Sequence, residues 1–226
     1  MNTSFWNGKK VLVTGHSGFK GSWLTLILNY LGADVCGISS SLLNNNQDLF
    51  HRLHLEDHCL SHDVDIRDKD IIKIFSDFKP DIVFHLAAQP LVRASYEIPF
   101  DTYDINVMGT LNILEIIRKS PSVKASVMIT TDKCYENKEW ARGYKEDDRL
   151  GGFDPYSSSK ACSELLIKSY QKSFSSESLA ISSVRAGNVI GGGDQSDDRL
   201  LPDIYRAITS NKTIKLRNPM ATRPWQ

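Results

Sequence analysis

The sequence feature that most restricts the fold of this chain is an apolar run that ends directly in a glycine-rich turn. The run KKVLVT predicts a buried strand over residues 11–14, and the segment after the turn predicts a helix over residues 19–31. We expect the helix to stop at Gly32, because glycine readily adopts the left-handed conformation found at helix ends. A strand, a turn and a helix in this order predict the start of a parallel α/β sheet.

The same alternation of short apolar runs and amphipathic segments continues along the chain. Further strands are expected over residues 34–38, 82–86, 126–130 and 179–184, and helices over residues 67–78, 106–117 and 156–174. The strands are almost continuously apolar, which is typical of a parallel sheet with helices on both faces. We therefore predict a doubly wound parallel sheet of the Rossmann type, with a turn-rich loop over residues 42–47.

Charge and cysteine content limit the classes of ligand. Lys+Arg and Asp+Glu number 27 each, and no run of like charge predicts a nucleic-acid partner or a charged membrane surface. The longest apolar stretch, residues 23–31, is too short to span a bilayer, and no targeting segment precedes the first strand, so we expect a cytoplasmic protein. The four cysteines form no CxxC pair, which favours reduced thiols over a zinc or redox site.

The glycine-rich turn GHSGFKG is a candidate pyrophosphate site. Glycines let the backbone turn tightly and approach a phosphate, and the exposed amides at a helix N-terminus favour its charge. The spacing Gly-x-x-Gly-x-x-Gly differs from the common dinucleotide-binding spacing, so a glycine-rich turn without a ligand is the alternative. The candidate cofactor contacts of this turn are Gly15, Ser17, Gly18, Phe19, Lys20 and Gly21.

Two further segments bear on dinucleotide binding, namely Asp65 with Ile66 and the end of the second strand. Asp65 follows the presumed third strand, where its carboxylate can accept from an adenine amino group while Ile66 offers its backbone; the alternative is that Asp65 caps a helix beginning at Arg67. The second strand ends in GISS, without an acidic residue for the ribose 2′-hydroxyl. The residues therefore leave NAD and NADP both open.

A tyrosine and a lysine spaced four residues apart are candidate catalytic groups. Tyr156 and Lys160 follow Pro155 at a helix start, which puts both side chains on one face. A nearby ammonium is expected to lower the tyrosine pKa from about 10 toward neutrality, so that the phenolate can serve as a base. The pair alone would also fit an exposed helix start, but Thr131 ends a predicted strand at the sheet edge where ligands bind.

Taken together, these motifs resemble the extended short-chain dehydrogenase/reductase family over essentially the whole chain. The resemblance rests on the glycine turn, on His85-Leu86-Ala87-Ala88, on Thr131 and on the YxxxK motif. The strings GKKVLVTGHSGFKGSW, HLAAQPLVR, TTDKCYEN, DPYSSSKACSE and AGNVIGGGD are similar to the CDP-glucose branch of the nucleotide-sugar 4,6-dehydratases. Lys133 supports this branch, because the related dTDP-glucose enzymes carry Glu there and sugar epimerases lack the acid pair.

The resemblance implies a reaction that uses NAD and removes water from CDP-glucose. It implies that Tyr156 is the base for the sugar C4 hydroxyl and that Thr131 orients this hydroxyl. It implies that Asp132 and Lys133 handle the protons of the elimination, in a division left open, and that Lys160 holds the nicotinamide ribose. The alternatives are another nucleotide-sugar dehydratase, epimerase or reductase, or a nucleotide-binding module without turnover.

The resemblance also adds contact residues and an organisation. The cofactor is expected against Leu86, Ala87 and Ala88, with Asn106 supporting the site; substrate contacts are expected at Gln89, Arg93, Asn188 and Arg223, of which the last two could equally be a turn asparagine and a surface arginine. Residues 1–190 would form the NAD-binding domain, and residues 191–226 the start of an incomplete substrate-binding region. A homodimer is expected through the helices over 106–117 and 156–174.

Four histidines form a competing metal motif. His51, His54, His58 and His62 would make one stripe on a continuous helix. Turn-rich sequence precedes the stripe and a strand is expected at its end. We therefore expect no metal site.

Overall fold

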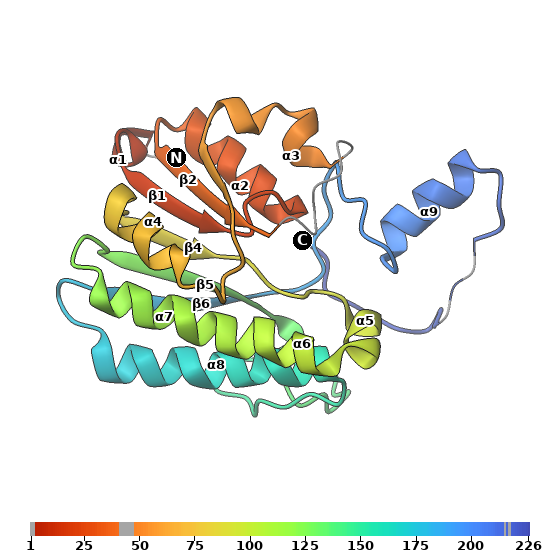
Figure 1. Cartoon of the computed structure of the whole chain (residues 1–226). Coiled ribbons are helices and arrows are strands. Elements are labelled where there is room, and N and C mark those ends of the chain that lie inside the picture. Colours follow the sequence, from red (N-terminus) through yellow and green to blue (C-terminus); the bar gives the residue numbers. More distant parts are fainter. Residues whose placement is uncertain (1–2, 41–47, 215, 217) are drawn as a thin grey trace.

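The computed structural model describes residues 3–40, 48–214, 216 and 218–226, so the loop expected over residues 42–47 lies outside the described residues. Within the described residues, parallel strands form one sheet in the order β3-β2-β1-β4-β5-β6 (Figure 1). The strands are β1 Lys10–Thr14, β2 Asp34–Ser39, β3 Leu60–Asp63, β4 Ile82–His85, β5 Ala125–Thr131 and β6 Ala180–Ala186. The predicted doubly wound parallel sheet is confirmed.

Helices cover both faces of the sheet. They are α1 Thr3–Trp6, α2 Phe19–Tyr30, α3 Leu49–Arg52, α4 Asp70–Phe78, α5 Val92–Glu97, α6 Pro99–Tyr103, α7 Thr110–Lys119, α8 Pro155–Phe174 and α9 Leu200–Thr209, with 3-10 turns at Leu55–Asp57 and Asp132–Cys134. A π-helix, Asp104–Gly109, joins α6 to α7. None of the described helices is long and apolar enough to cross a membrane.

Alternate side chains of the strands build two hydrophobic cores. Leu12 of β1 packs with buried residues of α4, α7 and α8 on one face. Val11 and Val13 of the same strand pack with Leu28 of α2 on the other face. Because strand side chains alternate in direction, this division explains why each run is apolar at every position.

Two helix boundaries differ from the sequence predictions. The helix expected from Arg67 begins at Asp70, because the Asp65 carboxylate accepts the Arg67 amide at 2.9 Å in a local turn that delays the helix. The reading of Asp65 as a helix cap is therefore wrong. The helix expected from Asn106 starts earlier, since the π-helix and α6 continue it back to Pro99. The end expected at Gly32 is confirmed by its φ of +85°.

The chain beyond β6 returns to the sheet. Asn188 forms a parallel bridge with Trp225, and the Asn188 amide donates to the Pro224 carbonyl at 3.0 Å. Helix α9 lies between these two segments and stands apart from the sheet and its covering helices (Figure 1). The chain after residue 190 therefore leaves the core and comes back beside the carboxyl end of β6.

Candidate active site

The turn after β1 approaches the segment after β4 too closely for side chains. Gly15 has a φ of +72°, and a Cβ on it would lie 2.8 Å from the Ala87 nitrogen. A Cβ on Gly21 would lie 2.0 Å from the Gly15 carbonyl oxygen. These contacts occur where the order of strands reverses between β1 and β4, which is the place where open parallel sheets bind ligands.

The same turn presents groups that suit a phosphate. Helix α2 begins after Gly18 without a side-chain cap, so the amides of its first turn are available for an anion. Ser17 Oγ is buried, and no described residue gives it a hydrogen-bond partner. A buried hydroxyl without a partner is uncommon in a folded protein and often marks a site for a ligand or water.

His16, which the sequence analysis did not single out, fixes the shape of this turn. Its Nδ1 lies 2.9 Å from Ser39 Oγ, and its Nε2 lies 2.7 Å from Ser61 Oγ. A Cβ on Gly37 would lie 2.1 Å from the imidazole, so the ring packs on β2 where that strand has no side chain. Burial lowers the pKa of His16 to about 4, so the ring is neutral at pH 7.

Asp65 is engaged by a neighbouring arginine. Its carboxylate accepts from Arg67 Nε at 2.9 Å and from Arg67 Nη2 at 2.7 Å, and hydrogen bonds with Arg67 keep its pKa below the usual value. The carbonyl of Ile66 accepts from the Asn112 side chain at 2.6 Å. Both groups expected to contact an adenine therefore already have protein partners.

A buried histidine holds the end of β4 against β1. His85 Nδ1 lies 2.7 Å from Thr14 Oγ1, and His85 Nε2 lies 3.1 Å from Thr110 Oγ1. The amide of Ala87 donates to Thr14 Oγ1 at 3.2 Å. Burial lowers the pKa of His85 to about 3. The half-buried residues Leu86 and Ala87 are thereby held beside the glycine turn, and Ala88 follows them.

Hydrogen bonds of Asn106 and Gln89 hold the loop after β4 in place beside the candidate site. Asn106 accepts from the Gln89 amide at 2.8 Å and donates to the Gln89 carbonyl and to Ser159 Oγ of α8. The Gln89 side chain donates to Thr102 Oγ1 at 2.9 Å and to the Leu91 carbonyl at 3.1 Å. In this structure both amides therefore bond within the protein and position the loop after β4 against α8.

Tyr156 and Thr131 come together at the carboxyl end of β5. Asp154 caps α8 by accepting from the Ser157 amide, and this places Tyr156 in the first turn of the helix. Burial raises the pKa of Tyr156 to about 12, although a hydrogen bond with the Thr131 side chain opposes the shift. The expectation of a lowered tyrosine pKa is wrong for this structure, because loss of hydration outweighs the nearby positive charge.

Lys160 is buried one helical turn after Tyr156. Its Nζ donates to the Ile129 carbonyl at 3.4 Å, and burial lowers its pKa to about 8. Its ammonium therefore faces the backbone of β5 in this structure, while the Thr131 side chain acts to lower the pKa of Tyr156.

Asp132 and Lys133 begin the 3-10 turn after β5. Asp132 Oδ1 accepts from Thr131 Oγ1 at 3.1 Å and lies 3.4 Å from Lys133 Nζ. Lys133 Nζ also donates to Asn188 Oδ1 at 3.1 Å. The structure therefore joins three predicted catalytic residues to a predicted substrate contact.

Positive charge gathers beside this group. Burial lowers the pKa of Lys20, and the nearby charges of Arg199 and Lys133 lower it further. Arg199 donates to Asp194 Oδ2 at 3.1 Å, and its charge also acts on Tyr156. Arg199 was not predicted from the sequence, because it lies in a polar segment without a motif. Such a cluster can bind an anion such as a diphosphate.

The remaining predicted substrate contacts lie at the surface. Arg93 on α5 forms an ion pair with Asp198 at 2.6 Å, which ties it to the segment before α9. Arg223 is exposed, and its Nη1 donates to the Thr222 carbonyl at 2.7 Å. The bridge between Asn188 and Trp225 nevertheless brings the segment that carries Arg223 beside Asn188.

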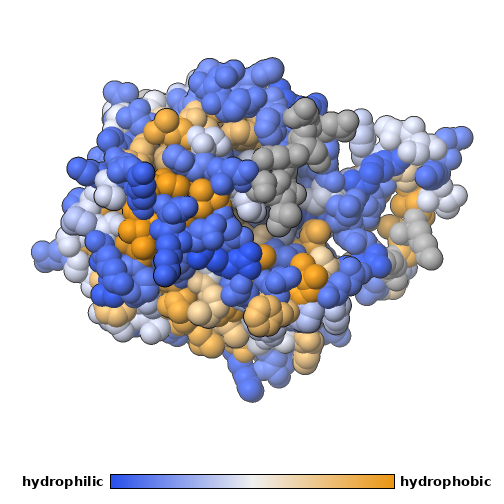
Figure 2. Space-filling view, viewed as in Figure 1, coloured by the Kyte–Doolittle hydropathy of each residue, from blue (hydrophilic) through white to orange (hydrophobic). Residues whose placement is uncertain are grey.

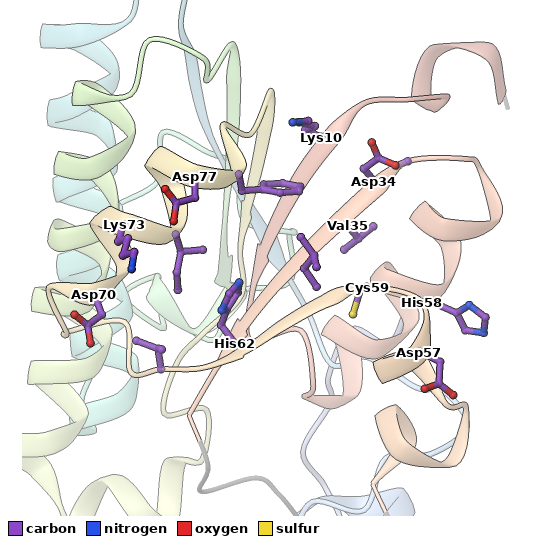
Figure 3. A pocket seen from close by; sticks show the side chains of 15 residues that line it. Lys10, Asp34, Val35, Asp57, His58, Cys59, His62, Asp70, Lys73 and Asp77 are labelled. Atoms are coloured by element: carbon purple, nitrogen blue, oxygen red, sulfur yellow. The ribbon is translucent and has the colours of Figure 1, made fainter.

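A cavity of about 1100 Å³ lies elsewhere (Figure 3). Its lining includes Lys10 and Asp34, at the amino ends of β1 and β2, and Asp77 of α4, and it includes none of the predicted site residues. We assign the candidate site to the opposite, carboxyl ends of the strands, because the reactive groups converge there. The four histidines do not share one helix, since α3 ends at Arg52 and β3 begins at Leu60.

Comparison with known proteins adds relatives to this geometry. The profile of the family described as GDP-mannose 4,6 dehydratase matches residues 12–226. A CDP-glucose 4,6-dehydratase from Salmonella typhimurium is 49% identical over 100% of the chain. The chain spans only 65% of the length of that relative.

Solved structures agree with the fold. An epimerase from Methanothermobacter thermautotrophicus superposes on 99% of the chain, and on 66% of its own length, with a TM-score of 0.86 and 23% identity. A UDP-glucuronic acid 4-epimerase from Bacillus cereus, solved with UDP-glucuronic acid and NAD, covers 96% of the chain and 68% of its own length, with a TM-score of 0.82 and 26% identity.

Proposed function

Because the chain belongs to the GDP-mannose 4,6-dehydratase family, we propose that it is a nucleotide-sugar 4,6-dehydratase that acts on CDP-glucose with NAD. The observation that carries this proposal is the meeting of Tyr156, Thr131 and Asp132 at the end of β5. Tyr156 can accept a proton from a sugar hydroxyl, and the carboxyl group of Asp132 can take part in the elimination of water. The close match to the Salmonella relative supports the choice of nucleotide.

The turn after β1 fits a dinucleotide. A pyrophosphate would be held by the turn from Gly15 to Gly21 and by the amides of α2, with Ser17 Oγ supplying a further hydrogen bond. Gly15 and Gly21 leave no room for a Cβ, because a side chain on either would collide with the backbone that shapes the turn. Phe19, Lys20, Leu86, Ala87 and Ala88 complete the proposed cofactor surface, with Asn106 behind it. Asp65 would contact adenine through its carboxylate, which can accept further hydrogen bonds beside those of Arg67, and Ile66 would contact it through its backbone.

When bound, NAD would supply reversible hydride transfer: it would accept a hydride from the sugar C4 and later return it to C6. Tyr156 takes the proton of the C4 hydroxyl while Thr131 orients that hydroxyl. Burial keeps the phenol protonated at pH 7 in this structure, and the charge of Arg199 already acts to lower its pKa; a positive charge on bound NAD would act in the same direction. Lys160 holds the nicotinamide ribose.

The elimination falls to the two residues that follow Thr131. The leaving C6 hydroxyl receives a proton through Asp132, which takes it from the Lys133 ammonium, and the pair accepts the C5 proton, made acidic by the 4-keto group, in return. Their separation of 3.4 Å lets a proton pass from the ammonium to the carboxylate, and the pair ends the step with as many protons as it began with. Gln89, Arg93, Asn188 and Arg223 are the proposed substrate contacts, and we divide the chain at residue 190 into cofactor and substrate regions.

We also propose a homodimer in the cytoplasm. Hydrophobic side chains gather on the lower half of the surface in Figure 2, over the helices α6, α7 and α8. Phe100 is 80% exposed, Leu165 is 58% exposed and Met108 is 52% exposed. Large exposed apolar groups on adjacent helices support a four-helix interface between two copies of the chain.

The test is mass spectrometry of the product after incubation with NAD and CDP-glucose, with dTDP-glucose and UDP-glucose in parallel. Loss of one water from CDP-glucose alone is the expected result. The matched control is Tyr156→Phe, which removes the base but keeps the ring, and should bind NAD without forming product.

A chain extended by the region that follows in the Salmonella relative provides the second arm, since the present chain spans 65% of that protein. Failure of both chains to convert CDP-glucose, or full activity of Tyr156→Phe, would contradict the proposal.

A further inference from the structure

A buried glutamate lies one helical turn after Lys160 on α8. Glu164 is 3% exposed. Its Oε1 accepts from Thr130 Oγ1, and its Oε2 accepts from Ser183 Oγ at 3.2 Å and from Arg185 Nη2 at 2.7 Å. Burying a charged carboxylate is costly unless charged and polar groups satisfy it, and here three donors do so.

These contacts connect the elements that carry the reactive residues. Thr130 lies on β5 directly before Thr131, and Ser183 and Arg185 lie on the neighbouring strand β6. Arg185 reaches further, because its Nη1 donates to the Glu146 carbonyl at 3.1 Å and its guanidinium lies 4.8 Å from the centre of the Tyr135 ring. The glutamate therefore joins α8, β5, β6 and the segment after the 3-10 turn.

Glu164 and Lys160 are both buried one turn apart on α8, and they contact adjacent residues of β5, because Lys160 donates to the Ile129 carbonyl and Glu164 accepts from Thr130 Oγ1. Three charged or titratable groups act on this lysine: Lys20 of α2 lowers its pKa, whereas Glu164 of its own helix and Cys134 of the 3-10 turn raise it. Burial raises the pKa of the Cys134 thiol to about 12, so the thiol is neutral at pH 7. Among these groups, Glu164 alone supplies a negative charge at neutral pH.

We propose that Glu164 is a positioning residue, whose carboxylate keeps the Lys160 ammonium charged and fixes the strand end beside it. It touches neither substrate nor cofactor, and it acts through its neighbours. Lys160 can hold a ribose hydroxyl with all of its donors only while it is protonated. Removing the negative charge beside a buried ammonium leaves burial and Lys20 to favour the neutral amine.

The direct test is the titration of Lys160 itself. The Cε chemical shift is followed against pH by NMR in protein labelled with [13C]lysine, and the signal is assigned by its absence in Lys160→Met. In Glu164→Gln, which keeps an acceptor for Thr130, the midpoint should move down by about one pH unit or more. The pH at which NAD affinity is lost should fall by the same amount.

Two further variants separate the charge from its structural contacts. Glu164→Asp keeps the negative charge and should restore the midpoint to near that of the unaltered protein. Arg185→Met removes the ion-pair partner but leaves the carboxylate, so the midpoint should stay or rise. If Arg185 left unpaired prevents Glu164→Gln from folding, the double variant Glu164→Gln/Arg185→Met removes both charges and carries the same prediction as the single one.

An unchanged Lys160 midpoint in the glutamine variants would overturn the proposal. An equal downward shift in Arg185→Met would also overturn it, because that result would assign the effect to packing. The inference rests on the proposed function only for the role of Lys160 in binding. Failure to convert CDP-glucose would count against the proposed function, while the NMR titration decides the role of Glu164 without substrate.

Discussion

Lys133 Nζ donates a hydrogen bond of 3.1 Å to Oδ1 of Asn188, which lies 55 residues later in the chain. This contact links the 3-10 turn after β5 to the segment after β6, which in turn pairs with residues 224–226. The ammonium also lies 3.4 Å from the Asp132 carboxylate. One lysine thus connects a proposed acid to the segment that we assign to the substrate.

Replacing this lysine should stop elimination without preventing cofactor binding. Lys133→Met removes the ammonium beside Asp132, so we expect dehydration of CDP-glucose to slow by about 10²-fold or more, as for the loss of an acid–base group. NAD affinity, measured by calorimetry, should remain within about twofold. Lys138→Met is the control, because Lys138 pairs with Glu136 at the surface and should keep full activity. If Lys133→Met and Lys138→Met lost the same amount of dehydration activity, the proposed role of Lys133 in the elimination would be wrong.

A methyl group at Gly21 should damage the glycine turn. Its Cβ would lie 2.0 Å from the Gly15 carbonyl oxygen, so Gly21→Ala forces the backbone of the turn to move. We expect about 1–3 kcal/mol of lost stability in urea unfolding, together with a marked loss of NAD affinity. In Gly143→Ala the new Cβ meets no atom within 4 Å, and stability should change by less than about 0.5 kcal/mol. Unchanged NAD binding in Gly21→Ala would argue against a phosphate at this turn.

Acid should destabilise the protein before its carboxylates titrate. His16 and His85 have folded-state pKa values of about 4 and about 3, below the unfolded value of 6.5. The unfolded chain therefore binds more protons as the pH falls below 6.5, and stability present above that pH is lost progressively. Between about pH 6.5 and 4.5 we expect a loss of about 2 kcal/mol for each histidine.

Urea unfolding at several pH values measures this slope. His85→Asn should be less stable at pH 7, because Thr14 and Thr110 lose a partner, but its slope between pH 6.5 and 4.5 should be shallower. A slope equal to that of the unaltered protein would show that His85 does not carry the effect.

Charge on the exposed face of α8 should separate the proposed dimer. Leu165 is 58% exposed, and Leu165→Glu would place a carboxylate in the proposed interface, so sedimentation should show monomers. Tyr30→Glu is the control, because Tyr30 is 87% exposed on α2, which packs on the opposite face of the sheet, and should leave the dimer intact. A monomeric unaltered chain at all concentrations would contradict the proposal.

The features that could be predicted from the sequence are those that depend on local patterns of residues. The strands and the glycine turn follow from apolar runs and from residues that must lack a Cβ, and both were found where expected. The π-helix was not predictable, since its apolar pattern reads as an ordinary helix. Arg199 and the pairing of Glu164 with Arg185 were also missed, because residues far apart in sequence bring these charges together. The tyrosine pKa was given the wrong direction for the same reason: burial depends on the whole fold.

The π-helix from Asp104 to Gly109 carries one residue more per turn than an α-helix. Deleting a single residue between Asn106 and Thr110 would yield a regular helix, but it would rotate Asn106 relative to α7 by about 100°. Asn106 would then lose its contacts with Gln89 and Ser159. Length variation among natural relatives should therefore avoid this stretch.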